Sequence, residues 1–155
     1  MFVFLCRSES FVIGLTGGSI KIFSRKTKSE IKTFSGYKCL YTGGIKPDES
    51  ECFALENGKH FYVYSLKTLE LIKRVTLPKS YVSVDVYGFY SHDGKVLNIP
   101  AHRYIFDDKY KEFGHYEYVL CKYETDNYTL IEKMSIPDKL PYLISTHEGW
   151  CGVAW

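Results

Sequence analysis

The chain has 155 residues, of which 45% are hydrophobic and 25% charged, a balance that suits one globular domain and argues against intrinsic disorder. Its 20 basic and 18 acidic residues leave a net charge of +2, which predicts no field strong enough to attract nucleic acid or an anionic membrane. The 14 Tyr and 10 Phe favour pleated, half-buried surfaces and therefore β-structure.

The first quarter of the chain predicts four short strands. Apolar residues recur there with a period near two, at 2–6, 11–15, 19–23 and 30–34. Residues typical of turns separate these runs, including Thr16-Gly17-Gly18 and the polar run Arg25-Lys26-Thr27-Lys28. The pattern indicates an antiparallel unit of four strands.

The same order of strands and turns follows twice more. The second unit predicts strands at 40–46, 51–56, 60–64 and 69–75, and the third at 81–90, 95–100, 118–123 and 129–134. These strands are separated by turn sequences, namely Pro47-Asp48-Glu49-Ser50, Asn57-Gly58 and Ser91-His92-Asp93-Gly94. We expect residues 142–155 to supply the opening strand of a fourth unit.

An internal repeat links the units. Residues 19–34 align without a gap to residues 60–75, 41 positions later, through five identities: Ser24/Ser65, Lys26/Lys67, Thr27/Thr68, Ile31/Ile72 and Lys32/Lys73. In the third unit, 59 positions after the second, Tyr123 falls at the place of Tyr64 and Leu130-Ile131 at that of Leu71-Ile72. The longer spacing reflects an insert at 101–117.

Four-stranded units of 40–45 residues are the blades of β-propellers. The segment KPDESECFALENGKHFYVYSLKTLELIKRV, residues 46–75, resembles blades of the WD-repeat and YVTN-type propellers, whose turns carry Pro-Asp and Lys-Thr pairs at these places. The Trp-Asp signature is absent, and Phe23-Ser24, Tyr64-Ser65 and Tyr123-Glu124 occupy its positions. The resemblance implies an all-β fold, a single partial propeller over 1–155, with blades at about 1–38, 40–78 and 80–138 and the first strand of a fourth at 142–155.

The cysteines indicate a reducing compartment. Five of them stand at wide spacings without a CxxC pair, namely Cys6, Cys39, Cys52, Cys121 and Cys151. We therefore expect free thiols in a cytoplasmic protein rather than a disulfide framework or a zinc ribbon. Residues 1–7 lack the basic region and cleavage site of a signal peptide, and no window of 18 apolar residues predicts a membrane span.

No motif for catalysis or cofactor binding stands out. The five histidines form no HxH or HExxH pattern, and no GxSxG elbow is present. We predict no catalytic residue, no cofactor and no metal. An alternative stays open, because some propellers related to the YVTN type are lactonases or quinone-dependent dehydrogenases with a site at the central channel. Asp85 is the candidate residue for such a site.

The insert at 101–117 is the candidate contact site. Placed between two strands of its unit, it should project as a longer loop or an extended hairpin, and its aromatic and charged residues suit a protein contact. The candidates are Arg103, Tyr104, Phe106, Asp107, Asp108, Tyr110, Phe113 and Tyr116. The alternative is that these aromatics pack on their own blade.

The resemblance most often implies a non-catalytic protein-interaction scaffold. We expect protein partners and self-association through open blade edges, and neither nucleic acid nor membrane as a partner. About three and a third blades fall short of a closed ring, so the chain is expected to be part of a longer propeller or to complete one with a second copy. A truncated reading frame without autonomous function is the remaining alternative.

Overall fold

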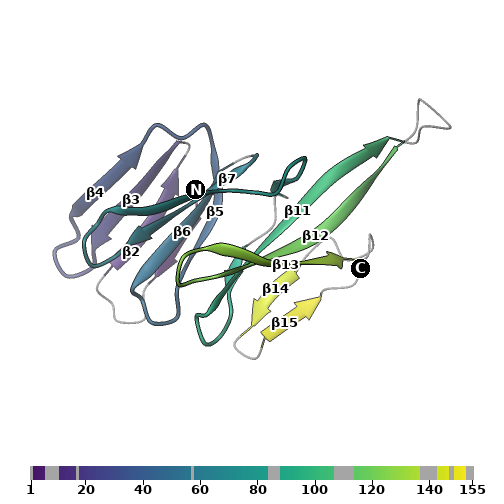
Figure 1. Ribbon diagram of the computed structural model, residues 1–155. Helices are drawn as coiled ribbons and strands as arrows, with labels where there is room; N and C mark the ends of the chain where they lie inside the picture. Colours follow the sequence, from purple (N-terminus) through teal and green to yellow (C-terminus); the bar gives the residue numbers. More distant parts are fainter. Residues whose placement is uncertain are drawn as a thin grey trace. The chain divides into compact units, whose positions relative to one another are not determined.

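The fold is all-β, as the sequence predicts. The computed structural model describes residues 2–5, 11–16, 18–56, 58–83, 88–106, 114–136, 143–146 and 149–152. Every regular element in these ranges is a strand, and the strands form four antiparallel sheets (Figure 1). The described ranges therefore contain no helix long and apolar enough to cross a membrane. The chain divides into two compact units, Met1–Thr76 and Leu77–Trp155.

The first unit contains two four-stranded meanders in which each strand pairs with the next along the chain. One sheet consists of β1 (Phe2–Leu5), β2 (Phe11–Thr16), β3 (Ser19–Ser24) and β4 (Glu30–Ser35). The other consists of β5 (Leu40–Ile45), β6 (Glu51–Glu56), β7 (His60–Ser65) and β8 (Leu71–Thr76). The predicted strand positions in these two meanders are confirmed, with boundaries that differ by one or two residues.

The core of the first unit lies between its two sheets. Ile20 and Ile22 on β3 pack with Cys52, Tyr62 and Tyr64 on β6 and β7 in one buried cluster. These residues alternate along their strands, so one face of each sheet is apolar and turns toward the other sheet. Burial of this shared face is what stacks the two meanders.

The second unit contains one five-stranded and one two-stranded sheet. The larger sheet has β10 (Phe89–Tyr90), β11 (Val96–Phe106), β12 (Gly114–Glu124) and β13 (Thr129–Ile136) in that order, and β9 (Val82–Ser83) also pairs with β11. The smaller sheet pairs β14 (Leu143–Thr146) with β15 (Gly149–Gly152). The single strand predicted at 142–155 is therefore wrong, because this segment turns back and pairs with itself.

The strand predicted at 81–90 is also interrupted. Ser83 pairs with Ala101 and Phe89 pairs with Asn98, so the chain from Ser83 to Phe89 is longer than the stretch of β11 that it faces. One continuous ladder cannot include both sets of pairs, and the described parts of the segment are the two short strands β9 and β10.

The internal repeat corresponds to a repeated local structure. The hydroxyl oxygen of Ser24 accepts a hydrogen bond from the amide of Thr27 at 3.2 Å, and Ser65 accepts the same bond from Thr68 at 3.0 Å. Each turn then places one residue at positive φ, namely Lys28, Leu69 and, in the third unit, Tyr128. The repeated serine therefore closes the turn between the third and fourth strands.

A β-bulge follows each of these turns at the same repeat position. Ile31, Ile72 and Ile131 are the extra residues in β4, β8 and β13, because the pairing skips them. All three side chains are exposed. A bulge inserts one unpaired residue and bends its strand, so the outer strand of each sheet is irregular at the same place.

Candidate functional site

The insert of the third unit forms an extended hairpin, which confirms one of the two shapes predicted for it. β11 and β12 pair without a break from Val96 opposite Glu124 to Phe106 opposite Gly114. Among the described residues, β9 pairs with β11 as far as His102, and β13 pairs with β12 from Tyr118 onward. The outer hairpin, residues 103–106 and 114–117, is therefore a two-stranded ribbon that projects beyond its own sheet (Figure 1).

One face of this hairpin is aromatic. Side chains alternate along a strand, so every second residue of β11 and its partners on β12 share a face. The rings on this face, which we call the aromatic face, belong to His102, Tyr104, Phe106, Tyr116 and Tyr118. Ring centroids lie 4.8 Å apart for Tyr104 and Phe106 and 5.1 Å apart for Tyr104 and Tyr116. His102 lies 5.0 Å from Tyr116 and so continues the row toward the sheet.

The outer rings of the aromatic face are open to solvent. Phe106 is 73% exposed, Tyr116 47% and Tyr104 42%, whereas Ile99 and Leu120 nearer the base of the same strands are buried. Scattered exposed apolar residues are normal on a protein surface, whereas these three rings lie next to one another in a row. Tyr104 contacts Phe106 and Tyr116 within the hairpin, so the alternative that these aromatics pack on their own blade stays a prediction beside the contact site.

A glycine shapes the end of the aromatic face. A Cβ added to Gly114 would lie 2.4 Å from the carbonyl oxygen of Ile105 and 2.4 Å from Cζ of Tyr104. The missing side chain therefore lets the Tyr104 ring lie across the facing strand. The close approach of a backbone is one of the uses of glycine within a strand.

The opposite face of the hairpin carries its charges. Arg103 and Glu117 face each other across the ribbon and form a hydrogen-bonded ion pair. The hydroxyl of Tyr81 donates a hydrogen bond to Glu117 at 2.8 Å, and the Arg103 guanidinium lies 5.1 Å from the centre of the Tyr81 ring. The hydrogen bonds from Tyr81 and then Arg103 hold the pKa of Glu117 below its usual value.

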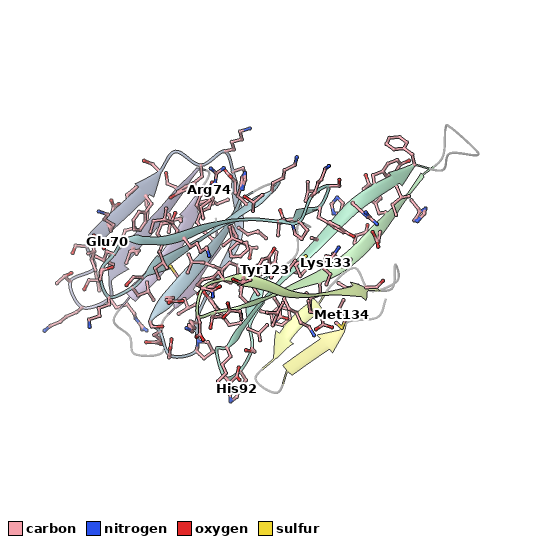
Figure 2. The ribbon with its side chains drawn as sticks, in the orientation of Figure 1. Glu70, Arg74, His92, Tyr123, Lys133 and Met134 are labelled. Atoms are coloured by element: carbon pink, nitrogen blue, oxygen red, sulfur yellow. The ribbon has the colours of Figure 1, made fainter. Side chains whose placement is uncertain are left out.

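Tyr81 ties the base of the hairpin to a third strand. The ammonium of Lys133 on β13 lies 5.1 Å from the Tyr81 ring, a cation–π contact that adds to that of Arg103. Lys133 and Met134 are consecutive on β13 and lie on its two faces (Figure 2). The polar face of the hairpin thus links it to β13 through Tyr81.

Four of the eight predicted site residues lie on this hairpin. Tyr104, Phe106 and Tyr116 share the aromatic face, whereas Arg103 lies on the opposite face. The other four, Asp107, Asp108, Tyr110 and Phe113, lie outside the described residues, as does Asp85. In the described ranges no group of three or more His, Cys, Asp or Glu residues could hold a metal ion.

Sequence reasoning missed His102, Tyr118, Gly114 and the anchor Tyr81. A signal for the first two was present, because His102, Tyr104 and Phe106 alternate with non-aromatic residues, as do Tyr116 and Tyr118. This alternation, continued past the edge of the insert, predicts a shared face.

Comparison with known proteins informs the fold. No protein-family model matches the chain, and no curated protein matches it either. Among solved structures, hydrazine synthase of Kuenenia stuttgartiensis is similar, with a TM-score of 0.67 and 14% sequence identity. The match covers 86% of this chain and 36% of that chain. At this identity the likeness concerns the arrangement of the strands alone.

Proposed function

We propose that this chain is a non-catalytic protein-interaction scaffold built on WD-like propeller blades, with the aromatic face of the β11–β12 hairpin as its contact surface. The observation that carries the proposal is the row of exposed rings on a ribbon that projects from its sheet. The blade reading is supported by the two four-stranded meanders of the first unit, which stack through a shared core.

The ring types and their packing favour a protein partner. Tyr and Phe supply a large contact area but lose few rotamers on binding, and tyrosine is enriched among residues that dominate binding energy. Tyr104 contacts both Phe106 and Tyr116, and Gly114 gives its ring space, so these contacts restrict the Tyr104 ring before a partner binds. Ordered groups lower the entropic cost of association.

The thiols support a cytoplasmic location. Cys39, Cys52 and Cys121 form no disulfide bond, and Cys52 and Cys121 are buried. Free, buried thiols are common in compartments that keep cysteine reduced. We propose that the scaffold works there, with partners that are themselves cytoplasmic proteins.

Affinity capture with the tagged full chain tests the proposed function. Phe106→Ala combined with Tyr116→Ala removes two exposed rings, and Ile131→Ala is the matched control, since Ile131 is an exposed side chain of the same sheet outside the hairpin. Proteins that both the parent chain and the Ile131→Ala control capture should not be captured by the Phe106→Ala, Tyr116→Ala double variant. Capture of the same proteins by all three chains would refute the proposal, provided that circular dichroism shows all three folded.

A further inference from the structure

We propose that Thr27, in the turn between β3 and β4, is a phosphorylation site for a serine/threonine kinase that recognises basic residues. The inference goes beyond the proposed function and does not depend on it, because it concerns a turn of the first unit rather than the β11–β12 hairpin. Three observations support it: the exposure of the turn, the cations on both sides of Thr27, and the contrast with the same turn in the second unit.

The turn, residues 25–29, is exposed along its whole length, so the Thr27 side chain is accessible to an enzyme. The Thr27 hydroxyl lies 2.7 Å from that of Ser29, which is itself exposed and can hydrogen-bond to water instead. Two further hydrogen bonds run from the Thr27 amide to the Ser24 hydroxyl at 3.2 Å and from the Ser24 amide to the Ser29 carbonyl at 2.9 Å. These bonds are all local, so the turn can open into a kinase cleft while the buried part of β3 stays in place.

Cations flank Thr27 on both sides. Arg25, Lys26 and Lys28 all lie within two positions of it, and residues 19–29 contain no Asp or Glu. The charge pattern around the acceptor is one of the features by which kinases select their substrates. Opposite charges also steer two proteins toward each other. The turn therefore suits a kinase whose substrate cleft is acidic.

The second unit repeats this turn without its cluster of cations. Thr68 aligns with Thr27 and is also exposed, and its amide donates the same hydrogen bond to the hydroxyl of Ser65, at 3.0 Å. Leu66, however, stands at the place of Arg25, is only 2% exposed and belongs to the buried core of the unit. The two turns therefore present the same acceptor in a similar local structure, and the cations distinguish Thr27 from Thr68.

The reaction is an ordinary phosphoryl transfer. The hydroxyl oxygen of Thr27 attacks the γ-phosphorus of ATP bound to Mg²⁺ in the kinase, and the new O–P bond forms as the bond to the leaving oxygen of ADP breaks. The hydroxyl proton passes to the catalytic aspartate of the kinase, and nothing is oxidised or reduced. The product phosphate has a charge of about −1.5 to −2 at pH 7, which the neighbouring guanidinium and ammonium groups stabilise. The first carboxylate that follows, Glu30, is hydrogen-bonded by Lys21 at 2.9 Å, which weakens its repulsion of the phosphate.

Kinase assays on the folded full chain test the inference. The chain is incubated with Mg²⁺, ATP and the catalytic domain of an arginine-directed serine/threonine kinase, and peptide mass spectrometry follows each modified site over time. Thr27 should be modified about tenfold or more faster than Thr68. Arg25→Ala combined with Lys26→Ala should slow the modification of Thr27 by a similar factor. Lys32→Ala is the matched control, since Lys32 is an exposed cation of β4 outside the turn, and it should leave the rate unchanged.

The contrary outcomes are equally specific. Equal rates at Thr27 and Thr68, or an unchanged rate in the double variant, would show that the cations do not direct the kinase and would overturn the inference. Modification of Ser24 or Ser29 in place of Thr27 would overturn the assignment of the acceptor. No modification of Thr27 in the folded chain, with a synthetic peptide of residues 19–34 as the positive control, would show that the turn does not open to a kinase. Circular dichroism of each variant excludes misfolding as the cause of a changed rate.

Discussion

The ring of Tyr104 occupies the space where a side chain on Gly114 would begin, since a Cβ at Gly114 would lie 2.4 Å from Cζ of that ring. The same Cβ would lie 2.4 Å from the carbonyl oxygen of Ile105, which is backbone and cannot swing away. The orientation of the exposed ring is therefore set by a residue that has no side chain.

Gly114→Ala should displace the Tyr104 ring and strain the end of the hairpin. We expect a loss of about 1–3 kcal/mol in the free energy of unfolding, the usual range for overpacking, measured by urea denaturation. In a Tyr104→Ala background the same change should cost less, because one of the two clashes is gone and effects at neighbouring sites are not additive. Equal costs in both backgrounds would show that the ring does not depend on the glycine.

Glu117 should make stability depend on pH in the acid range. Its pKa is lowered in the folded chain by the Tyr81 hydroxyl and the Arg103 guanidinium. The carboxylate therefore contributes stability that is present above its unfolded pKa of about 4.5 and is lost as pH falls through the lower folded pKa. Urea denaturation between pH 7 and pH 3 should show a smaller loss of stability for Glu117→Gln than for the parent chain.

Tyr81→Phe gives the matched control for this pH effect. It removes the hydrogen bond to Glu117 but keeps the ring that Arg103 and Lys133 both contact. The pKa of Glu117, followed by NMR, should rise toward its ordinary value in this variant. An unchanged titration would show that the Tyr81 hydroxyl does not stabilise the carboxylate.

Cys121 should resist modification in the folded chain. Burial raises the pKa of its thiol to about 11, so at pH 8 only about one thiol in a thousand is ionised. Iodoacetamide labelling followed by peptide mass spectrometry should find Cys121 unmodified under native conditions and fully labelled in urea. Cys39, which is only partly buried, is the internal comparison and should react before it. Rapid native labelling of Cys121 would contradict its burial between strands.

The repeated serine should matter more than the repeated lysine beside it. Ser65→Ala removes the acceptor for the Thr68 amide, and we expect a cost of about 1 kcal/mol in the free energy of unfolding. Lys67 is exposed in the same turn, and Lys67→Ala should change stability by less than about 0.5 kcal/mol. Equal losses in the free energy of unfolding for the two variants, measured by urea denaturation, would mean that the serine hydroxyl does not stabilise the turn.

Local pattern was enough to predict most strands, because their signals lie within the strands themselves. The segment that became β7 is a short run of aromatic and β-branched residues, and the repeated Ser24 and Ser65 mark turns whose hydrogen bonds are local. The interruption between β9 and β10 was not predictable in this way, since it depends on the register that both strands adopt against β11. Pairing between strands is decided by distant residues.

The candidate site was predictable in position and shape but not in its division into faces. The aromatic residues of the insert identified the hairpin, yet their interpretation by residue type alone put Arg103 with the rings that it faces away from. Tyr81 was missed because its link to Glu117 spans 36 positions and leaves no trace in local sequence. Gly114 was missed because nothing in the local sequence indicates that the Tyr104 ring lies over it.

The bulges at Ile31, Ile72 and Ile131 have a consequence for how copies of the chain meet in a crowded cell. Each interrupts the outermost strand of its sheet, where a row of unpaired amides and carbonyls would otherwise offer a template to any passing strand. A strand arriving from another molecule would meet a bend after a few residues, with lysine side chains beside it at Lys32 and Lys73. Each repeated unit therefore has a bulge in its outer strand, which disfavours edge-to-edge pairing with other molecules and so disfavours fibre growth.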